Sequence, residues 1–328
     1  MRLTKRTWLL VLLAGLVVYV ITYLALRFTP NPFFFSILLL LGASVVPASC
    51  LTFLLGRESR LTGNIHSFLS PVLVCLLLGG TIGVLTAGSA EHLMNNPDAI
   101  WFRVGVGPLE EFAKLIVPLV LFIAFRKRFR SQMHGLLFGV TTGVAFSILE
   151  TMGYGLVALV NSSGNAAAIN NGMFFHSLMS PANHIAWTGF IAALLWRERL
   201  RTGKPVTALV VAGFLTVAAL HIGWNAVSSL DNLVAVVAGD LAIAAVSLLL
   251  VYLQLREAEQ NEAPAMFRAM PRMVKVGSTA MKVAPAAVEV VPGTVEMASP
   301  AVSGSKRTVT FLVPYSRHED LARKTQGS

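Results

Sequence analysis

Apolar segments long enough to cross a lipid bilayer follow one another through the first 253 residues of this chain. About 20 apolar helical residues cross a bilayer core that is about 30 Å thick. Only 13% of the residues are charged, whereas a soluble globular chain carries about a quarter. The sequence therefore predicts an all-α, polytopic membrane helix bundle with about eight transmembrane helices. The predicted spans are Trp8–Leu26, Phe33–Leu55, Ser70–Ala87, Pro108–Phe125, His134–Val160, Phe174–Trp196, Val206–Val227 and Leu233–Leu253.

The lysines and arginines that flank these segments predict how the bundle is oriented. Thirteen of them precede the first span or lie in the loops after the second, fourth and sixth spans, and two lie in the opposite loops. Because positively charged loops stay in the cytoplasm, we expect a multi-pass protein of the cell membrane with both termini cytoplasmic. The net charge of +10 belongs to this pattern, so we expect membrane lipid, and no nucleic acid, as a partner. A cleaved signal peptide is the alternative for the first span.

Three regions are expected along the chain. Residues 1–107 form an N-terminal three-span region whose outer loop, Gly88–Gly107, is either a short interfacial helix or a plain connection. Residues 108–253 form a transmembrane core that carries the polar residues. Residues 254–328 lack a sustained helical or strand period and are expected to be a disordered cytoplasmic tail, with one isolated β-like stretch at Thr308–Tyr315.

Four successive spans contain polar residues where a lipid-facing helix would have none. Each charged group costs a few kcal/mol near the bilayer centre. Counted at 1.5 Å per residue, the polar residues lie in the outer half of the membrane in all four spans, and each has a companion four residues away on the same helical face. We therefore expect one polar site that opens to the outer side. Its residues are Glu110, Glu111 and Lys114 in the fourth span, Glu150 in the fifth, His184 in the sixth, and His221 and Asn225 in the seventh.

The start of the fourth span suggests how its carboxylates are stabilised. Pro108 suits the first turn of a helix, which would place Glu110 and Glu111 beside free backbone N–H groups at the positive end of the helix dipole. Lys114 can neutralise one of the two carboxylates. The simpler reading of Glu110 and Lys114 is a buried salt bridge without catalytic activity.

Glutamate together with histidine is typical of sites that activate water. A carboxylate in a dry cavity is a usable general base, and histidine or asparagine can donate hydrogen bonds to an oxyanion. Glu150, His184 and His221 could instead hold a metal, because two imidazoles and a carboxylate are a common catalytic zinc set. The competing reading of each histidine is a hydrogen-bond partner between helices. His66, His92, His134, His176 and His318 are expected to be ordinary polar residues, although His176 is eight residues from His184 and so near its face.

The order of these motifs resembles the PrsW family of intramembrane proteases, which is related to the type II CAAX prenyl endopeptidases and the bacteriocin-processing membrane proteases. The resemblance rests on EExxK at Glu110–Lys114, FxxxE at Phe146–Glu150, an intramembrane His184, and HxxxN at His221–Asn225. It implies that Glu110 activates water, that Glu111 supports it with Lys114 as charge partner, and that His221 and Asn225 stabilise the oxyanion.

The resemblance also implies that Glu150 and His184 complete a water or metal site. Zinc and no metal at all both remain open as the cofactor. The implied substrate is a membrane protein that is cut on the extracytoplasmic side, as in the first cleavage of anti-sigma factors. Glu150 stands where the CAAX-type enzymes have histidine, so a prenylated substrate is not expected.

Two other functions use the same residue types. A proton- or ion-coupled transporter could use a relay of glutamate and histidine, but it would need polar residues in the inner halves of the helices, and Leu115–Phe125 is apolar. A haem protein with His184 and His221 as axial ligands would not need the three glutamates. We therefore expect an intramembrane peptidase.

Overall fold

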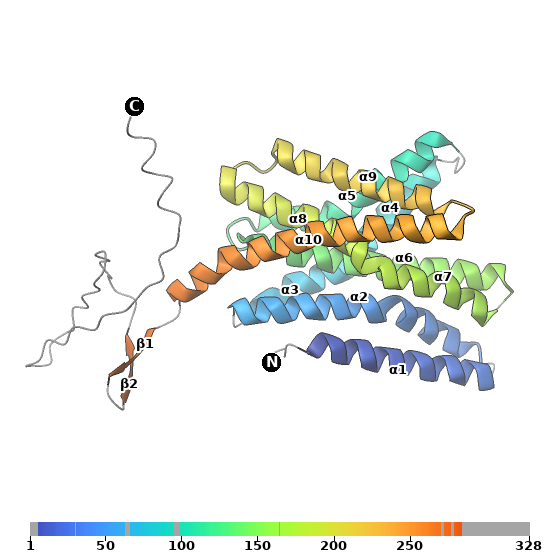
Figure 1. Ribbon diagram of the computed structural model, residues 1–328, viewed down its shortest axis with the longest axis horizontal. Helices are drawn as coiled ribbons and strands as arrows, with labels where there is room; N and C mark the ends of the chain where they lie inside the picture. The colour runs from blue at the N-terminus through green and yellow to red at the C-terminus, as the bar shows by residue number, and fades with distance from the viewer. Residues whose placement is uncertain are drawn as a thin grey trace, which may run out of the picture. The chain divides into compact units, whose positions relative to one another are not determined.

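The computed structural model describes residues 6–29, 31–62, 66–94, 99–163, 165–269, 272–276 and 279–283. The chain forms two compact units, Met1–Met266 and Phe267–Ser328. The first unit is a helix bundle, as predicted (Figure 1). The helices are α1 Thr7–Phe28, α2 Phe33–Thr62, α3 His66–Val74, α4 Gly80–Met94, α5 Ile100–Ala124, α6 Gln132–Asn161, α7 Ala166–Met179, α8 His184–Thr202, α9 Ala208–Ser228 and α10 Leu233–Ala269.

Within the described residues, six helical segments are long and apolar enough to cross a membrane. They are Thr7–Phe28, Phe33–Leu61, Phe68–Met94, Gln132–Asn161, Ala208–Ser228 and Leu233–Glu262. The chain is therefore a multi-pass membrane protein, while the count of eight stays a prediction. The fourth and sixth predicted spans fall on α5 and α8, whose charged residues lower their apolarity. Other helices cover much of α5 and α8, so fewer of their side chains face lipid and polar residues are tolerated there.

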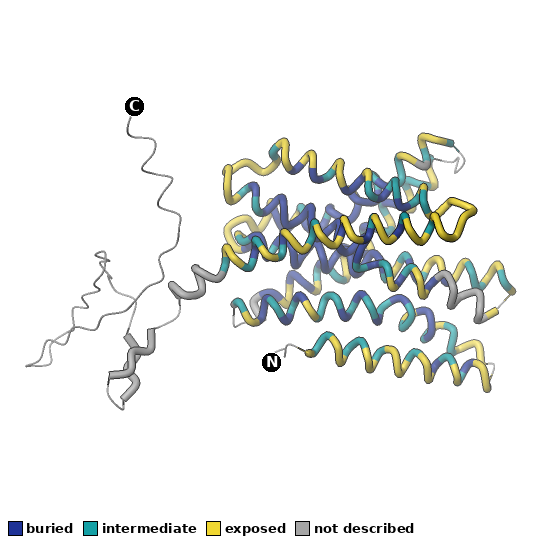
Figure 2. The backbone as a smooth tube through the Cα atoms, in the orientation of Figure 1, coloured by how far each residue is buried: buried dark blue, intermediate teal, exposed yellow. Residues whose placement is uncertain are grey.

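The centre of the bundle is the packing of α6 against α8. Glycines recur every four residues on α6, at Gly135, Gly139 and Gly143, and small residues at this spacing let two membrane helices approach closely. A Cβ atom on Gly135 would lie 2.5 Å from the Ala192 carbonyl oxygen, and one on Gly139 would collide with the Thr188 carbonyl oxygen. Buried residues gather on α6 and α8, whereas exposed residues recur along α1 and along α10 as far as Glu262 (Figure 2). Those outer helices present apolar side chains, which suits contact with lipid.

Local sequence signals fix the ends of the two central helices. At the start of α6, the Ser131 hydroxyl accepts a hydrogen bond from the His134 backbone N–H, and the His134 ring accepts one from the Ser131 N–H. This capping box satisfies two backbone donors that have no partner within the helix. At the C-terminal end of α8, Gly203 adopts φ 72°, a left-handed conformation that glycine adopts without strain.

α4 and α5 extend into the loop that the sequence predicts between them. α4 continues to Met94 and α5 begins at Ile100, so most of the expected outer interfacial loop belongs to membrane helices. Pro108 lies inside α5 rather than in its first turn. The expected stabilisation of Glu110 and Glu111 by the helix dipole is therefore wrong, because Glu110 lies about 15 Å from the start of α5 and that effect fades within one turn.

The sixth predicted span is not one continuous helix. α7 ends at Met179, a 3₁₀ turn covers Ser180–Ala182, and α8 begins at His184. Pro181 lies in this turn, and Asn183 has φ −120° and ψ −108°, which interrupts the helical backbone. The Asn183 side chain accepts a hydrogen bond from the His184 N–H at 2.6 Å. Irregular backbone at membrane depth is tolerated where protein buries it or where it lines a cavity, so the break points to a site.

The part of the chain after the last predicted span is more ordered than expected at its start. α10 continues past Leu253 to Ala269. Arg57 contacts Glu259 at 2.6 Å and Arg197 contacts Glu257 at 3.0 Å, so this extension is paired with α2 and α8. In the second unit, β1 Arg272–Val276 pairs antiparallel with β2 Thr279–Val283, with Val274 opposite Met281. Thr308–Tyr315 lies outside the described residues, and the three regional boundaries remain predictions.

Candidate functional site

The ammonium group of Lys114 is the centre of a buried polar cluster. Its Nζ donates to Glu111 Oε1 at 2.7 Å and to Glu110 Oε2 at 3.2 Å, and it lies 2.6 Å from His184 Nδ1. Its three N–H groups therefore have three partners, two of them carboxylates. The Lys114 side chain is 0% exposed, and its Nζ also lies 4.1 Å from the centre of the Phe146 ring. Lys114 neutralises one negative charge and holds residues of α5 and α8 together.

The imidazole of His221 is oriented by Glu111. His221 Nδ1 donates to Glu111 Oε1 at 3.0 Å, and its Nε2 lies 3.8 Å from Glu110 Oε2. A carboxylate on one ring nitrogen fixes the tautomer and leaves the other nitrogen available. In the neutral ring, Nε2 therefore carries a lone pair that faces Glu110. The two adjacent carboxylates have different environments. Glu111 binds Lys114 and His221 through Oε1 alone, and its Oε2 is buried without a hydrogen-bond partner. Glu110 faces His221 Nε2 and also contacts Glu91 of α4.

His184 joins this part of the cluster to Glu150. Its Nδ1 accepts from Lys114, so in the neutral ring the proton lies on Nε2. Nε2 is 2.8 Å from Glu150 Oε2, close enough for an ion pair, although the pair lacks hydrogen-bond geometry and this oxygen is buried without a hydrogen-bond partner. The short contact without an aligned hydrogen bond marks Glu150 as an incompletely satisfied member of the cluster.

His176 also belongs to the cluster, and the sequence interpretation of it as an ordinary polar residue is wrong. Its Nε2 lies 3.6 Å from Glu150 Oε2, and its ring centre lies 5.8 Å from that of His184. Its Nδ1 is 2.7 Å from the hydroxyl of Thr151. The eight-residue spacing from His184 indicated that the two histidines could share a helical face, but only if one continuous helix contained both. The break between α7 and α8 makes the real geometry unpredictable from that spacing.

Trp187 is a second residue whose role the sequence did not indicate. Its indole ring lies 4.9 Å from the His221 ring and 5.6 Å from the His184 ring, between centres. The indole N–H donates to the Ser247 hydroxyl at 2.8 Å, which ties the ring to α10. Trp187 therefore packs against both histidines and holds them in place. The signal that could have found it is its position one helical turn after His184.

Asn225 is the one predicted site residue that no polar contact joins to the buried cluster among the described residues. It lies on α9 one turn beyond His221 and is half-buried. Among the described residues, no hydrogen bond links the Asn225 amide to the cluster. The other six predicted residues are all joined to it by contacts of 3.2 Å or less. Their catalytic roles stay predictions.

Two sets of residues in this cluster could hold a metal ion. They are Glu110 with His184 and His221, and Glu150 with His176 and His184, and in each set the ligand atoms lie within 4.8 Å of one another. Carboxylate oxygen with two imidazole nitrogens is a donor set that suits zinc. The sequence-predicted set of Glu150, His184 and His221 takes members from both. The cluster therefore fits a metal, and His184 is common to the two arrangements.

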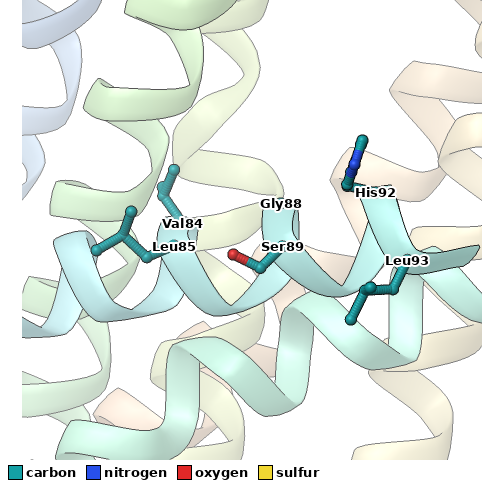
Figure 3. Close-up of a pocket in the computed structure, with 6 residues that line it drawn as sticks. All are labelled: Val84, Leu85, Gly88, Ser89, His92 and Leu93. Atoms are coloured by element: carbon teal, nitrogen blue, oxygen red, sulfur yellow. The ribbon is translucent and has the colours of Figure 1, made fainter.

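An open groove elsewhere on the surface lacks such chemistry. It has a volume of about 500 Å³ and runs along one face of α4 (Figure 3). Its lining contains one imidazole and no carboxylate, so it cannot supply the acid and base groups found in the buried cluster. The lining residues are Val84, Leu85, Gly88, Ser89, His92 and Leu93.

A family model described as PrsW family intramembrane metalloprotease matches residues 69–254. This range contains every residue of the buried cluster. No curated protein and no solved structure matches the chain.

Proposed function

Because this chain belongs to the PrsW family of intramembrane metalloproteases, we propose that Glu110 activates a water molecule that hydrolyses a peptide bond of a membrane protein. The observation that carries the proposal is the 3.8 Å separation of Glu110 Oε2 from His221 Nε2. Two groups at this separation can both contact one water molecule. Each group also has a second partner, because Lys114 donates to the same Glu110 oxygen and Glu111 accepts from His221 Nδ1.

In this mechanism each residue has a distinct proton or charge role. Glu110 takes a proton from the water as it attacks the scissile carbonyl carbon, and passes it to the leaving amine as the C–N bond breaks. Lys114 offsets part of the carboxylate charge before the proton arrives. His221 can donate to the oxyanion from Nε2 only when its ring is doubly protonated, because Nδ1–H is held by Glu111. Glu111 orients the ring so that Nε2 points away from its own carboxylate.

Asn225 is the second proposed oxyanion donor. Its amide is half-buried and makes no hydrogen bond to a described residue, so it is available for substrate. One helical turn from His221, it lies on the same face of α9. A donor aimed at the developing oxyanion typically contributes about a hundred- to a thousand-fold to the rate.

The metal implied by the family fits the cluster, and we propose zinc. Glu110, Glu150, His176, His184 and His221 are the residues able to hold it. When bound, such an ion polarises a carbonyl or water oxygen as a Lewis acid. The proton transfer proposed for Glu110 and the hydrogen bond proposed for His221 use this chain's own side chains.

The proposed substrate is a membrane-spanning protein that is cut near the outer leaflet, such as an anti-sigma factor. Two observations support this side. The lysine and arginine distribution predicts that both termini are cytoplasmic. With that orientation, Glu150 and His221 lie about 16 Å and 10 Å from the outward ends of α6 and α9. His176 and Glu150 are also the most exposed ionisable groups of the cluster, at 18% and 14% of their side chains.

Packing disfavours the haem alternative. The rings of His184 and His221 pack edge to face with centres 5.3 Å apart. Trp187 lies against both of them. A macrocycle has no room between these rings, so axial ligation by this pair would require the core to separate.

The test is cleavage of a single-span membrane substrate by purified protein in liposomes. Glu110→Gln keeps the size of the side chain and removes its basicity, so turnover should fall about a hundred- to ten-thousand-fold. Glu198→Gln is the matched control, since Glu198 is a buried glutamate at the other end of α8, about 21 Å from His184 along the helix. Equal turnover by Glu110→Gln and wild type would refute the assignment of the base.

A further inference from the structure

We infer that the metal of this protein is bound by Glu150, His176 and His184, and that His176 is a ligand which the family motifs do not indicate. The inference deepens the proposed function, on which it rests only for the presence of a metal. It selects one of the two donor sets in the cluster. Four observations carry it: the spacing of the donors, the support of His176, the position of Lys114 and the balance of charge.

The spacing of the donor atoms suits a small divalent ion. Glu150 Oε2 lies 2.8 Å from His184 Nε2 and 3.6 Å from His176 Nε2. In a tetrahedral zinc site, bonds of about 2.0–2.1 Å place the ligand atoms about 3.3 Å apart. The two observed distances lie on either side of this value. The 2.8 Å contact also lacks hydrogen-bond geometry, as expected of two atoms that face a common third partner.

Thr151 supports His176 in the way that outer residues support metal-binding histidines. Its buried hydroxyl lies 2.7 Å from His176 Nδ1. When Nδ1–H donates to this oxygen, the Nε2 lone pair faces Glu150 and is available to a metal. Thr151 is one residue after Glu150 on α6, so a single turn of helix positions one ligand and orients another.

The alternative set, Glu110 with His184 and His221, already contains a cation. Lys114 Nζ lies 3.2 Å from Glu110 Oε2 and 2.6 Å from His184 Nδ1. A metal placed among these donors would face an ammonium group at close range. Among the described residues, no lysine or arginine forms an ion pair with Glu150. The set around Glu150 therefore offers the better place for a second cation.

The charge of the cluster favours a divalent ion. Glu91 of α4 contacts Glu110, and two carboxyl groups in contact share one proton, so together they carry one negative charge. Glu111 and Glu150 add one negative charge each, and Lys114 supplies one positive charge. With neutral histidines, a balance of two negative charges remains in a largely buried site, where unpaired charge is strongly unfavourable. One divalent cation beside Glu150 makes the cluster neutral.

Metal binding at His184 Nε2 has a consequence for its hydrogen bonds. The ring proton moves from Nε2 to Nδ1, so no proton leaves the residue. Nδ1–H could then no longer accept from Lys114, whose Nζ would have to leave its 2.6 Å contact, and Glu111 Oε1, 4.0 Å away, would be the nearest carboxylate acceptor. Lys114 keeps Glu110 and Glu111 as partners.

The test measures metal binding directly in purified full-length protein. Metal is first removed with a chelator, and Zn²⁺ or Co²⁺ is then titrated, with the visible absorption of Co²⁺ as a report on its ligands. The His176→Ala and His221→Ala variants each lose one imidazole from a different set. We expect one ion per chain in wild type and in His221→Ala, and loss of tight binding and of the cobalt spectrum in His176→Ala.

Thr151→Val provides a second variant that keeps all ligands. Removal of the hydroxyl should weaken metal binding about 10–100-fold, while circular dichroism and size-exclusion profiles stay those of the wild type. Retained binding in His176→Ala, lost binding in His221→Ala, or no binding by wild type would each overturn the assignment. Because metal titration needs no substrate, these results are separable from failure of peptide cleavage, which would instead contradict the proposed function.

Discussion

The buried charge of Lys114 gives the sharpest prediction about stability. Lys114→Met replaces the ammonium group with an apolar side chain of similar length, which can follow the same path through the core. The change removes donors to Glu110 and Glu111 and leaves His184 Nδ1 without its 2.6 Å partner. The two carboxylates then remain buried without their cation.

The expected loss of stability follows from the burial of Lys114 and Glu111. Lys114 and Glu111 are both 0% exposed at the side chain, so solvent does not screen the change. Removal of one partner of a buried ion pair lowers the free energy of unfolding by about 3–5 kcal/mol. Replacement of both partners by neutral groups is much less harmful, so Lys114→Met combined with Glu111→Gln should recover about 2 kcal/mol relative to additivity.

The free energy of unfolding can be measured by SDS titration in micelles or by steric trapping in bilayers. Lys127→Met is the control, because Lys127 lies exposed after α5 and its loss should change stability by about 0.5 kcal/mol or less. A decrease below about 1 kcal/mol for Lys114→Met, or strict additivity in the double variant, would refute the description of Lys114 as the centre of the cluster.

Three further predictions concern the scaffold around the site. Gly139→Leu should separate α6 from α8 and lower the free energy of unfolding by about 1–3 kcal/mol, as measured by the same titration. Gly153→Leu on α6 is the control and should have little effect, because a Cβ atom there meets nothing within 4 Å. Equal effects of the two variants would contradict the close packing of α6 on α8. Asn183→Ala removes the acceptor for the His184 N–H and should lower stability by about 0.5–2 kcal/mol, with turnover falling further than in Asn183→Ser, which keeps an acceptor. Glu257→Gln breaks a partly exposed pair with Arg197, so its effect should be about 1 kcal/mol or less and should vanish at high salt.

Much of the fold and most of the cluster could be predicted from the sequence. Apolar length gave the helix bundle, and the repeated cost of buried polar groups identified Glu110, Glu150, His184 and His221 as residues that must meet. The length of an apolar segment does not show where its helix begins when the residues before it, such as Trp101 and Gly105, suit either a membrane helix or a loop at the membrane surface. α5 therefore begins earlier than predicted.

The features that escaped prediction depend on tertiary packing. Ser180–Asn183 carries one proline, and whether a helix bends or breaks at a proline depends on what surrounds it. Once the backbone breaks there, His176 no longer follows the helical spacing from His184. Its contact with Glu150 arises from the meeting of α7 and α6, which no local pattern encodes.

Hydrolysis in heavy-oxygen water tests most directly whether the buried cluster activates a water molecule. Wild-type protein, Glu110→Gln and Glu198→Gln are reconstituted in liposomes with a single-span substrate, and the new carboxyl terminus is analysed by mass spectrometry. We predict a labelled carboxyl terminus for wild type and for Glu198→Gln, and almost no product for Glu110→Gln. Labelled product formed by Glu110→Gln at the wild-type rate would contradict the claim that the buried cluster activates the water.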